Sequence, residues 1–239
     1  MNMPLHTAAE NGNPKRKALI AALRDLAGRE RGALAAQQNE ALRLLERQDL
    51  LWYLLLQSLA TWGRGGGWDG LIGNPANYSR VTFDAVGELP VEERAEKLAE
   101  VFCEAGVRYH NIKGRCLAAC YERVAELGGP EQATRYFLEL QDRAQIIRFL
   151  GGFKGIGPKY VRNIPMDIYH PAFRDAIALD ARIQRISRAL GLPYGPRDYE
   201  PHEAWYLAVG REVGLSGWEM DRLLYAHYKE ILAAIESNH

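Results

Sequence analysis

The sequence of 239 residues has little of what marks several protein classes. Its three cysteines, an odd number, cannot build a disulfide framework and are typical of a reducing compartment. No apolar run approaches the roughly 18 residues that a membrane span needs, and residues 1–16 contain no apolar signal segment. Because 47% of the residues are apolar, a disordered chain is also excluded. We therefore expect a soluble, intracellular protein with a substantial core and no membrane partner.

The cysteines offer little support for a metal site. Cys116 and Cys120 lie four residues apart on an expected helix, so both could reach one metal, but no second pair nearby completes a ligand set. We interpret these two and Cys103 as ordinary buried or half-buried thiols, and we expect no metal.

The sequence also lacks a net charge, which argues against a protein held on nucleic acid by its overall charge. The charge is unevenly distributed, however, because residues 154–188 hold seven basic side chains against three acidic ones, a local excess of +4. A local basic face suits a polyanionic partner at one site. A solvated helix face would give the same count.

Sustained alternation of apolar and polar residues, the pattern of a half-buried strand, is missing. Apolar residues instead recur at spacings of three and four, which predicts an all-α protein whose helices each bury one face. Glycine and proline mark short joints between the helices and indicate a compact body without long linkers. The expected helices span residues 15–28, 31–46, 49–61, 91–104, 111–127, 131–140, 142–150, 158–168, 180–190, 201–213 and 217–235.

One joint, after the helix expected at 142–150, holds Gly155 and Gly157 around the apolar Ile156. Two glycines allow positive φ angles and a close approach of the backbone to a partner, and Pro158 suits the first turn of the next helix. The open N–H groups of a helix start attract an anion. Dinucleotide-binding folds share the Gly-x-Gly pattern, but they place a strand before it, whereas a helical pattern precedes it here.

Two segments resemble a known family. Residues 150–159, Leu-Gly-Gly-Phe-Lys-Gly-Ile-Gly-Pro-Lys, resemble the helix-hairpin-helix of the endonuclease III superfamily of DNA glycosylases, and residues 178–185, Ala-Leu-Asp-Ala-Arg-Ile-Gln-Arg, resemble the segment with that family's catalytic aspartate. The resemblance implies a two-lobed helical fold with an interlobe cleft. Residues 47–165 would form a central domain that ends in the hairpin, and residues 1–46 with 166–239 would form the second domain.

The resemblance implies that Lys159 is a nucleophile and Asp180 its catalytic partner across the cleft. A neutral lysine amine can attack the sugar C1′ as the glycosidic bond breaks, and the resulting Schiff base permits β-elimination of the 3′ phosphate. Partial burial with Arg162 nearby would favour the neutral amine, and an ionised Asp180 would accept its proton and stabilise positive charge on the sugar. We therefore expect a DNA glycosylase and AP lyase of base excision repair, acting as a monomer on damaged double-stranded DNA in the cytoplasm, associated with the nucleoid.

Further residues take expected roles from the same resemblance. The damaged base must leave the stack, so side chains are needed that hold the backbone, line the pocket and fill the gap. Simple packing of Trp62, a helix-end hydrogen bond of Asn163 and ordinary surface positions for the opposite-strand residues stay open as alternatives. The candidates are Gly155, Gly157, Lys154, Arg162, Arg182 and Arg185 for the DNA backbone, Gln57, Ser58, Trp62 and Asn163 for the pocket or gap, and Arg108, Tyr109 and His110 for the opposite strand.

The chain departs from endonuclease III itself, which ends in a four-cysteine iron–sulfur cluster. No cysteine follows Cys120, so we expect no iron–sulfur cluster and no other cofactor. The resemblance then moves to the cluster-free enzymes that excise 8-oxoguanine, with oxidised pyrimidines as the second candidate lesion. Val161 stands where the family usually has alanine, and the segment between Lys159 and Asp180 is slightly long, which could reshape the rim of the cleft.

Two other classes fit part of the pattern. In a non-enzymatic helix-hairpin-helix module, Lys159 would be one more phosphate contact. In an all-helical interaction protein, the basic segment would be a solvated face. Asp180 favours the enzyme, because a negative charge inside a basic segment weakens phosphate binding and has no use in a binding module.

Overall fold

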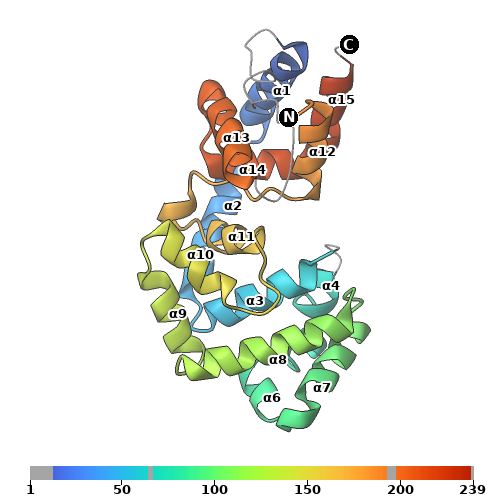
Figure 1. The fold of residues 1–239 in the computed structure, drawn as a ribbon, viewed down its shortest axis with the longest axis vertical. Coiled ribbons are helices and arrows are strands. Elements are labelled where there is room, and N and C mark those ends of the chain that lie inside the picture. The colour runs from blue at the N-terminus through green and yellow to red at the C-terminus, as the bar shows by residue number, and fades with distance from the viewer. Residues whose placement is uncertain (1–12, 64–66, 193–197, 238–239) are drawn as a thin grey trace. The chain divides into compact units, whose positions relative to one another are not determined.

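The computed structural model describes residues 13–63, 67–192 and 198–237, and over these residues the chain is helical without a β-strand (Figure 1). The all-α class predicted from the apolar spacing is thereby confirmed. The chain forms two compact units: the central unit, Arg43–Ile164, and the terminal unit, Met1–Leu42 together with Pro165–His239. Within the described ranges, no helix has the length and apolar character needed to cross a membrane.

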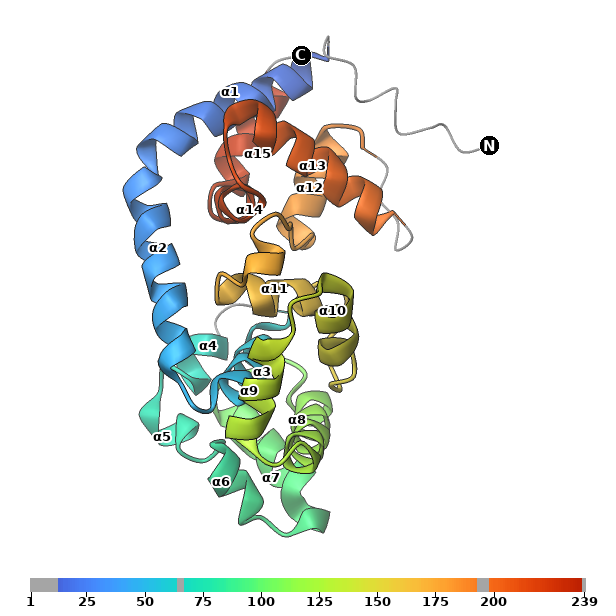
Figure 2. The same ribbon diagram turned by 90° about the vertical axis from the view of Figure 1, so that its left-hand side faces the viewer.

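The central unit is built around α3, a helix that is apolar on nearly every side. Its Trp52 is fully buried, and the indole N–H donates to the Val81 carbonyl at 3.0 Å. Helices α7 and α8 lie side by side in Figures 1 and 2, and Gly114 permits this contact because a Cβ there would lie 2.5 Å from the Ala95 carbonyl oxygen. The helices of this unit are α3 (Leu50–Thr61), α4 (Gly67–Leu71), α5 (Pro75–Tyr78), α6 (Phe83–Gly87), α7 (Val91–Glu104), α8 (His110–Glu126), α9 (Pro130–Glu139) and α10 (Arg143–Gly151).

The terminal unit joins the first helices of the chain to the last ones. The first helix, α1, packs against α13 and α15 and buries Leu19, Leu23 and Leu26. Asn13 caps its start, because the side chain accepts the Lys15 N–H at 3.0 Å. The elements of this unit are α1 (Pro14–Arg29), α2 (Arg31–Arg43, ending at the boundary), the 3₁₀ turn η3 (Pro171–Phe173), α12 (Ala181–Ala189), α13 (Tyr199–Val213), α14 (Gly217–Ala226) and α15 (Tyr228–Glu236). Helix α11 (Tyr160–Asp167) begins in the central unit and ends in the terminal unit.

Three expectations about the helices need correction. The helix expected at 217–235 is two helices, because His227 has a φ of −105° and a ψ of 21°, which ends α14 and starts α15. Buried apolar residues continue on both sides of this break, so their spacing does not reveal it. The segment between the helices expected at 49–61 and 91–104, where no helix was expected, holds the short helices α4, α5 and α6. The helix expected at 31–46 ends at Arg43, and a 3₁₀ turn at Leu44–Glu46 follows.

Candidate functional site

The turn between α10 and α11, residues 152–159, carries the glycine pattern of the sequence. Gly155 has a φ of +88°, and a Cβ there would lie 3.0 Å from Leu59 Cδ2 of α3 and 3.1 Å from Cys116 Sγ of α8. Glycine is therefore required at this position by both the backbone angle and the space. Gly157 has no positive φ and nothing within 4 Å of a Cβ, so the expected pair of conformationally special glycines reduces to one.

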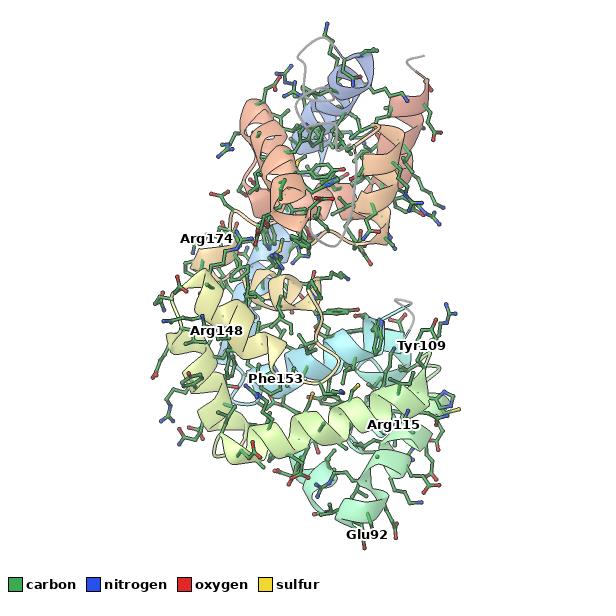
Figure 3. All side chains as sticks on the ribbon, in the orientation of Figure 1. Glu92, Tyr109, Arg115, Arg148, Phe153 and Arg174 are labelled. Atoms are coloured by element: carbon green, nitrogen blue, oxygen red, sulfur yellow. The ribbon has the colours of Figure 1, made fainter. Side chains whose placement is uncertain are left out.

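Aromatic and sulfur contacts fix this α10–α11 turn on α8. Phe153, labelled in Figure 3, is buried, and the Arg123 guanidinium carbon of α8 lies 4.9 Å from the centroid of its ring. The Cys120 thiol donates to the Lys154 carbonyl at 3.4 Å. Burial raises the pKa of Cys120 to about 12, so the thiol keeps the proton that it donates. Buried Cys120 thus has a packing role, whereas Cys103 is exposed, contrary to the expectation for that thiol.

Four backbone N–H groups of the turn, those of Lys154, Gly155, Gly157 and Lys159, donate to no other atom in the described part of the chain. The intervening Ile156 N–H is satisfied inside the turn by the Phe153 carbonyl at 3.1 Å. Unpaired N–H groups clustered before a helix form a favourable environment for an anion. The turn can therefore bind an oxygen of a phosphate group.

Lys159 is the last residue of the turn and has a half-buried side chain, with its amine 4.6 Å from the centroid of the Tyr160 ring. Lys159 and Pro158 both precede α11, whereas the sequence placed them in its first turn. The Lys159 carbonyl accepts the Asn163 N–H at 2.9 Å, so the half-buried Asn163 lies one helical turn further on. Arg162 is buried and donates to the Pro158 carbonyl at 3.0 Å, so its guanidinium closes the turn from inside.

Trp62 follows the end of α3 and lies beside the turn. Together with residues 151–157 it lines a hollow of about 430 Å³. The fully buried Lys113 donates to the Trp62 carbonyl at 2.6 Å, and burial, followed by the charge of Arg108, lowers the pKa of Lys113 to about 8. Tyr109, labelled in Figure 3 at the N-terminal end of α8, is exposed and has a φ of +59°. The centroid of its ring lies 6.2 Å from that of the Trp62 ring. The structure thus brings Trp62, a candidate for the pocket or gap, close to Tyr109, a candidate for contact with the opposite strand.

The other candidates for the pocket and the opposite strand have different environments. Gln57 is half-buried on α3. Ser58 is buried, and its hydroxyl donates within α3 to the carbonyl four residues earlier at 2.8 Å, so this side chain is used inside the helix. Arg108 is exposed, with its guanidinium carbon 5.3 Å from the centroid of the Tyr109 ring, and the half-buried His110 begins α8.

The basic candidates divide into exposed side chains and bound ones. Lys154 and Arg185 are exposed. Arg182 is half-buried: its guanidinium carbon lies 3.9 Å from the centroid of the Tyr225 ring, and Nη1 donates to the Tyr225 carbonyl at 3.0 Å. Arg182 therefore links α12 to the end of α14.

Asp180 belongs to the terminal unit and is the N-cap of α12. One carboxylate oxygen, Oδ1, accepts the N–H groups of both Arg182 and Ile183 at 2.9 Å. These are N–H groups that the start of a helix leaves without a partner. The second oxygen, Oδ2, accepts no hydrogen bond from the residues that the structure describes. Asp180 is thus both fixed by one oxygen and open at the other.

No motif of the sequence marked the residues that hold the backbone before Asp180. The N–H groups of residues 177–179 donate to the side chains of Glu203, Asp221 and Tyr199. The one available signal was an acid within an apolar helix pattern, since Asp221 directly follows the buried Met220.

Helical DNA glycosylases are the class whose fold this chain has. Solved structures with this fold include the 8-oxoguanine DNA glycosylase of Thermotoga maritima, at 20% identity and a TM-score of 0.68 over 88% of this chain and 95% of that chain. The 8-oxoguanine DNA glycosylase of Methanocaldococcus jannaschii is similar at 18% identity and a TM-score of 0.66, over 88% of this chain and 93% of that one.

A third structure, the M. jannaschii 8-oxoguanine glycosylase/lyase in complex with a 15mer DNA containing 8-oxoguanine, gives a TM-score of 0.61 at 16% identity, over 87% of this chain and 95% of that chain. No protein-family profile and no curated protein matches the sequence. At such low identities the likeness shows the fold.

Proposed function

We propose that this protein is a bifunctional DNA glycosylase and AP lyase of base excision repair, with Lys159 as the nucleophile and Asp180 as its catalytic partner. The observation that carries the proposal is a half-buried lysine at the end of a turn with unpaired N–H groups, in a fold shared with 8-oxoguanine DNA glycosylases. The proposed partner is double-stranded DNA with a damaged base, bound by a monomer of the protein.

The α10–α11 turn is the proposed grip on the DNA backbone. The unpaired N–H groups of Gly155 and Gly157 would bind a phosphate beside the lesion, and the exposed Lys154 adds positive charge there. Trp62 and Tyr109 lie on the same unit as the turn and would fill the gap that the flipped base leaves. Contacts of the turn with α3 and α8 keep these groups in a fixed arrangement.

The proposed reaction begins when the neutral Nζ of Lys159 attacks C1′ of the flipped nucleotide. The new C–N bond forms as the glycosidic bond breaks, and the base leaves with the bonding electrons and takes up a proton. Asp180 Oδ2, which is free of hydrogen bonds within the described residues, would accept the amine proton and stabilise positive charge on the sugar. The sugar ring opens to a Schiff base, loss of a C2′ proton expels the 3′ phosphate, and water then releases Lys159.

8-Oxoguanine is the proposed lesion. The likeness to three structures of 8-oxoguanine DNA glycosylases supports this choice over an oxidised pyrimidine. Besides water, the proposed reaction uses only side chains and backbone groups of this chain, so we propose that it needs no cofactor.

The proposal is tested by borohydride trapping on duplexes that carry 8-oxoguanine, an oxidised pyrimidine, uracil or an abasic site. We expect a covalent adduct and strand nicking with 8-oxoguanine, and loss of both in Lys159→Ala. Lys154→Ala, which removes an exposed lysine of the same turn, is the matched control and should still form the adduct. Absence of an adduct on every duplex, or an adduct that survives Lys159→Ala, would refute the lysine mechanism. DNA binding without any reaction would instead indicate a binding module.

A further inference from the structure

The backbone directly before Asp180 is buried but belongs to no helix. Residues 176–179 are at most 3% exposed and have no regular secondary structure. Buried N–H groups outside helices and strands must find other acceptors, because an unpaired one is costly. In this segment side chains of later helices supply these acceptors.

Three consecutive N–H groups, those of residues 177, 178 and 179, each donate to one side chain. The acceptors, in the same order, are Glu203 Oε1 at 2.9 Å, Asp221 Oδ1 at 2.8 Å and the Tyr199 hydroxyl at 3.1 Å. The Tyr199 hydroxyl also donates to the Ile177 carbonyl at 2.8 Å and so bridges both ends of the segment. Two helices, α13 and α14, thereby fix the path of the chain into Asp180.

Helix α14 holds the preceding residues as well. The Gly217 N–H donates to Asp175 Oδ1 at 3.1 Å, and the Trp218 N–H donates to the Arg174 carbonyl at 2.7 Å. A Cβ at Gly217 would lie 2.5 Å from the Ala176 nitrogen, so glycine is needed for this approach. The carboxylate that accepts the N–H of residue 178 lies one turn later on the same helix. One face of α14 therefore contacts the backbone from residue 174 to residue 178.

Of the three side chains that accept the N–H groups of residues 177–179, that of Asp221 is the least easily explained by packing alone. It is 3% exposed, and burial raises its pKa to about 6 against the opposing effects of Arg222 and the Ala178 N–H. Its Oδ2 lies 3.4 Å from Arg222 Nη1, and Arg222 is also paired with Asp167 at 2.8 Å. A buried acid costs stability, so a position that needed only volume would be better filled by an apolar residue.

We propose that Asp221, supported by Tyr199, is a positioning residue that fixes the backbone before Asp180 and so holds the open Asp180 Oδ2 in place for the reaction. The inference rests on the proposed function of Asp180. Asp221 acts through hydrogen bonding and not through contact with DNA. A reacting group that is misplaced by about 1 Å can lose about a hundredfold in rate.

The test compares four variants. Asp221→Leu removes the acceptor at similar volume, and Asp221→Asn keeps an oxygen for the Ala178 N–H. Tyr199→Phe removes only the bridging hydroxyl. Tyr206→Phe is the matched control, because this buried tyrosine of the same unit bonds Ser187 at 2.8 Å and has no hydrogen bond to residues 177–179.

The measurements are the single-turnover rate of 8-oxoguanine excision, the affinity for the duplex and the melting temperature. We expect excision to be about a hundredfold slower in Asp221→Leu and about tenfold slower in Tyr199→Phe, with duplex affinity within about threefold of wild type. Asp221→Asn should restore the rate to within about threefold of wild type. Tyr206→Phe should lower the melting temperature while leaving the rate unchanged.

Each result decides the inference. The inference would be overturned if the folded variants Asp221→Leu and Tyr199→Phe excised 8-oxoguanine at the wild-type rate. It would also be overturned if Asp221→Asn were as slow as Asp221→Leu, because the retained oxygen would then have no effect. If Asp221→Leu does not fold, Tyr199→Phe against Tyr206→Phe decides. Failure of the wild-type protein on every duplex would refute the proposed function itself, and this inference would fall with it.

Discussion

The central and terminal units hold their candidate catalytic residues in different ways. In the central unit, the turn that ends at Lys159 is closed by bonds between near neighbours, such as Ile156 with Phe153 and Arg162 with Pro158. In the terminal unit, the backbone before Asp180 is held by side chains 20 to 43 residues further along the chain. The hydrogen bonds that close the lysine turn are thus local, although the turn also packs on α3 and α8, whereas the hydrogen bonds that hold the backbone before Asp180 come from distant parts of the sequence.

Asp180→Asn should have the largest effect and should separate chemistry from structure on the aspartate side. Asparagine caps a helix about as well as aspartate, so α12 should stay intact, but the amide cannot take the amine proton. We expect excision of 8-oxoguanine to fall by about a thousandfold, within the range for loss of a general base. Excision rates, duplex affinity and melting temperature measure the effect. A large loss of affinity or of thermal stability would show that Asp180 is structural.

Gly155→Ala should break the lysine side. The substituted residue would have to adopt a φ near +88° and would meet Leu59 and Cys116. We expect a loss of about 2–4 kcal/mol in the free energy of unfolding, from backbone strain and overpacking together. Gly157→Ala, at a position with open space and no positive φ, is the matched control. Urea denaturation that gives equal losses for both variants would contradict the structural difference between these glycines.

The two sides also differ in what the sequence could predict. The glycine, proline and lysine of the α10–α11 turn are adjacent in sequence, so their pattern was readable, although the φ of Gly157 and the start of α11 after Lys159 were not. Tyr199, Glu203 and Asp221 come together with the segment before Asp180 only through packing of α13 and α14. Spacing along one helix cannot show such contacts. The break at His227 escaped for a similar reason, because buried apolar residues continue across it.

Asp221→Asn should change the pH dependence of stability in the acidic range. Burial raises the pKa of Asp221 in the folded protein from 3.8 to about 6. The protonated carboxyl therefore adds to the free energy of unfolding below the pKa of the unfolded chain, and this addition is lost as the pH rises through about 6. Between pH 5 and pH 8 the free energy of unfolding of Asp221→Asn should therefore rise by about 1.4 kcal/mol relative to that of wild type. This is the free energy of about one pKa unit, because wild type loses stability only between pH 5 and its folded pKa of about 6. Urea titrations at both pH values measure this, and a constant difference would contradict it.

Lys113→Met should give the corresponding effect in the central unit, at higher pH and with the opposite sign. Burial lowers the pKa of Lys113 in the folded protein from 10.5 to about 8. The neutral amine therefore adds to the free energy of unfolding above the pKa of the unfolded chain, and this addition is lost as the pH falls through about 8. Wild type should gain about 1.4 kcal/mol in free energy of unfolding relative to Lys113→Met between pH 7 and pH 9. Lys97→Met, at an exposed lysine of α7, is the control. The same pH dependence in both variants would exclude burial as its cause.

The most direct test of the central claim, that Lys159 is the nucleophile, is to locate the reduced adduct. After borohydride trapping on an 8-oxoguanine duplex and digestion of the DNA and the protein, mass mapping identifies the peptide that carries the sugar remnant. We predict the added mass on Lys159 alone, with none on Lys154, which is exposed, or on Lys113, whose amine is buried and bonded to Trp62. A remnant on any other lysine or on the N-terminal amine would contradict this mechanism.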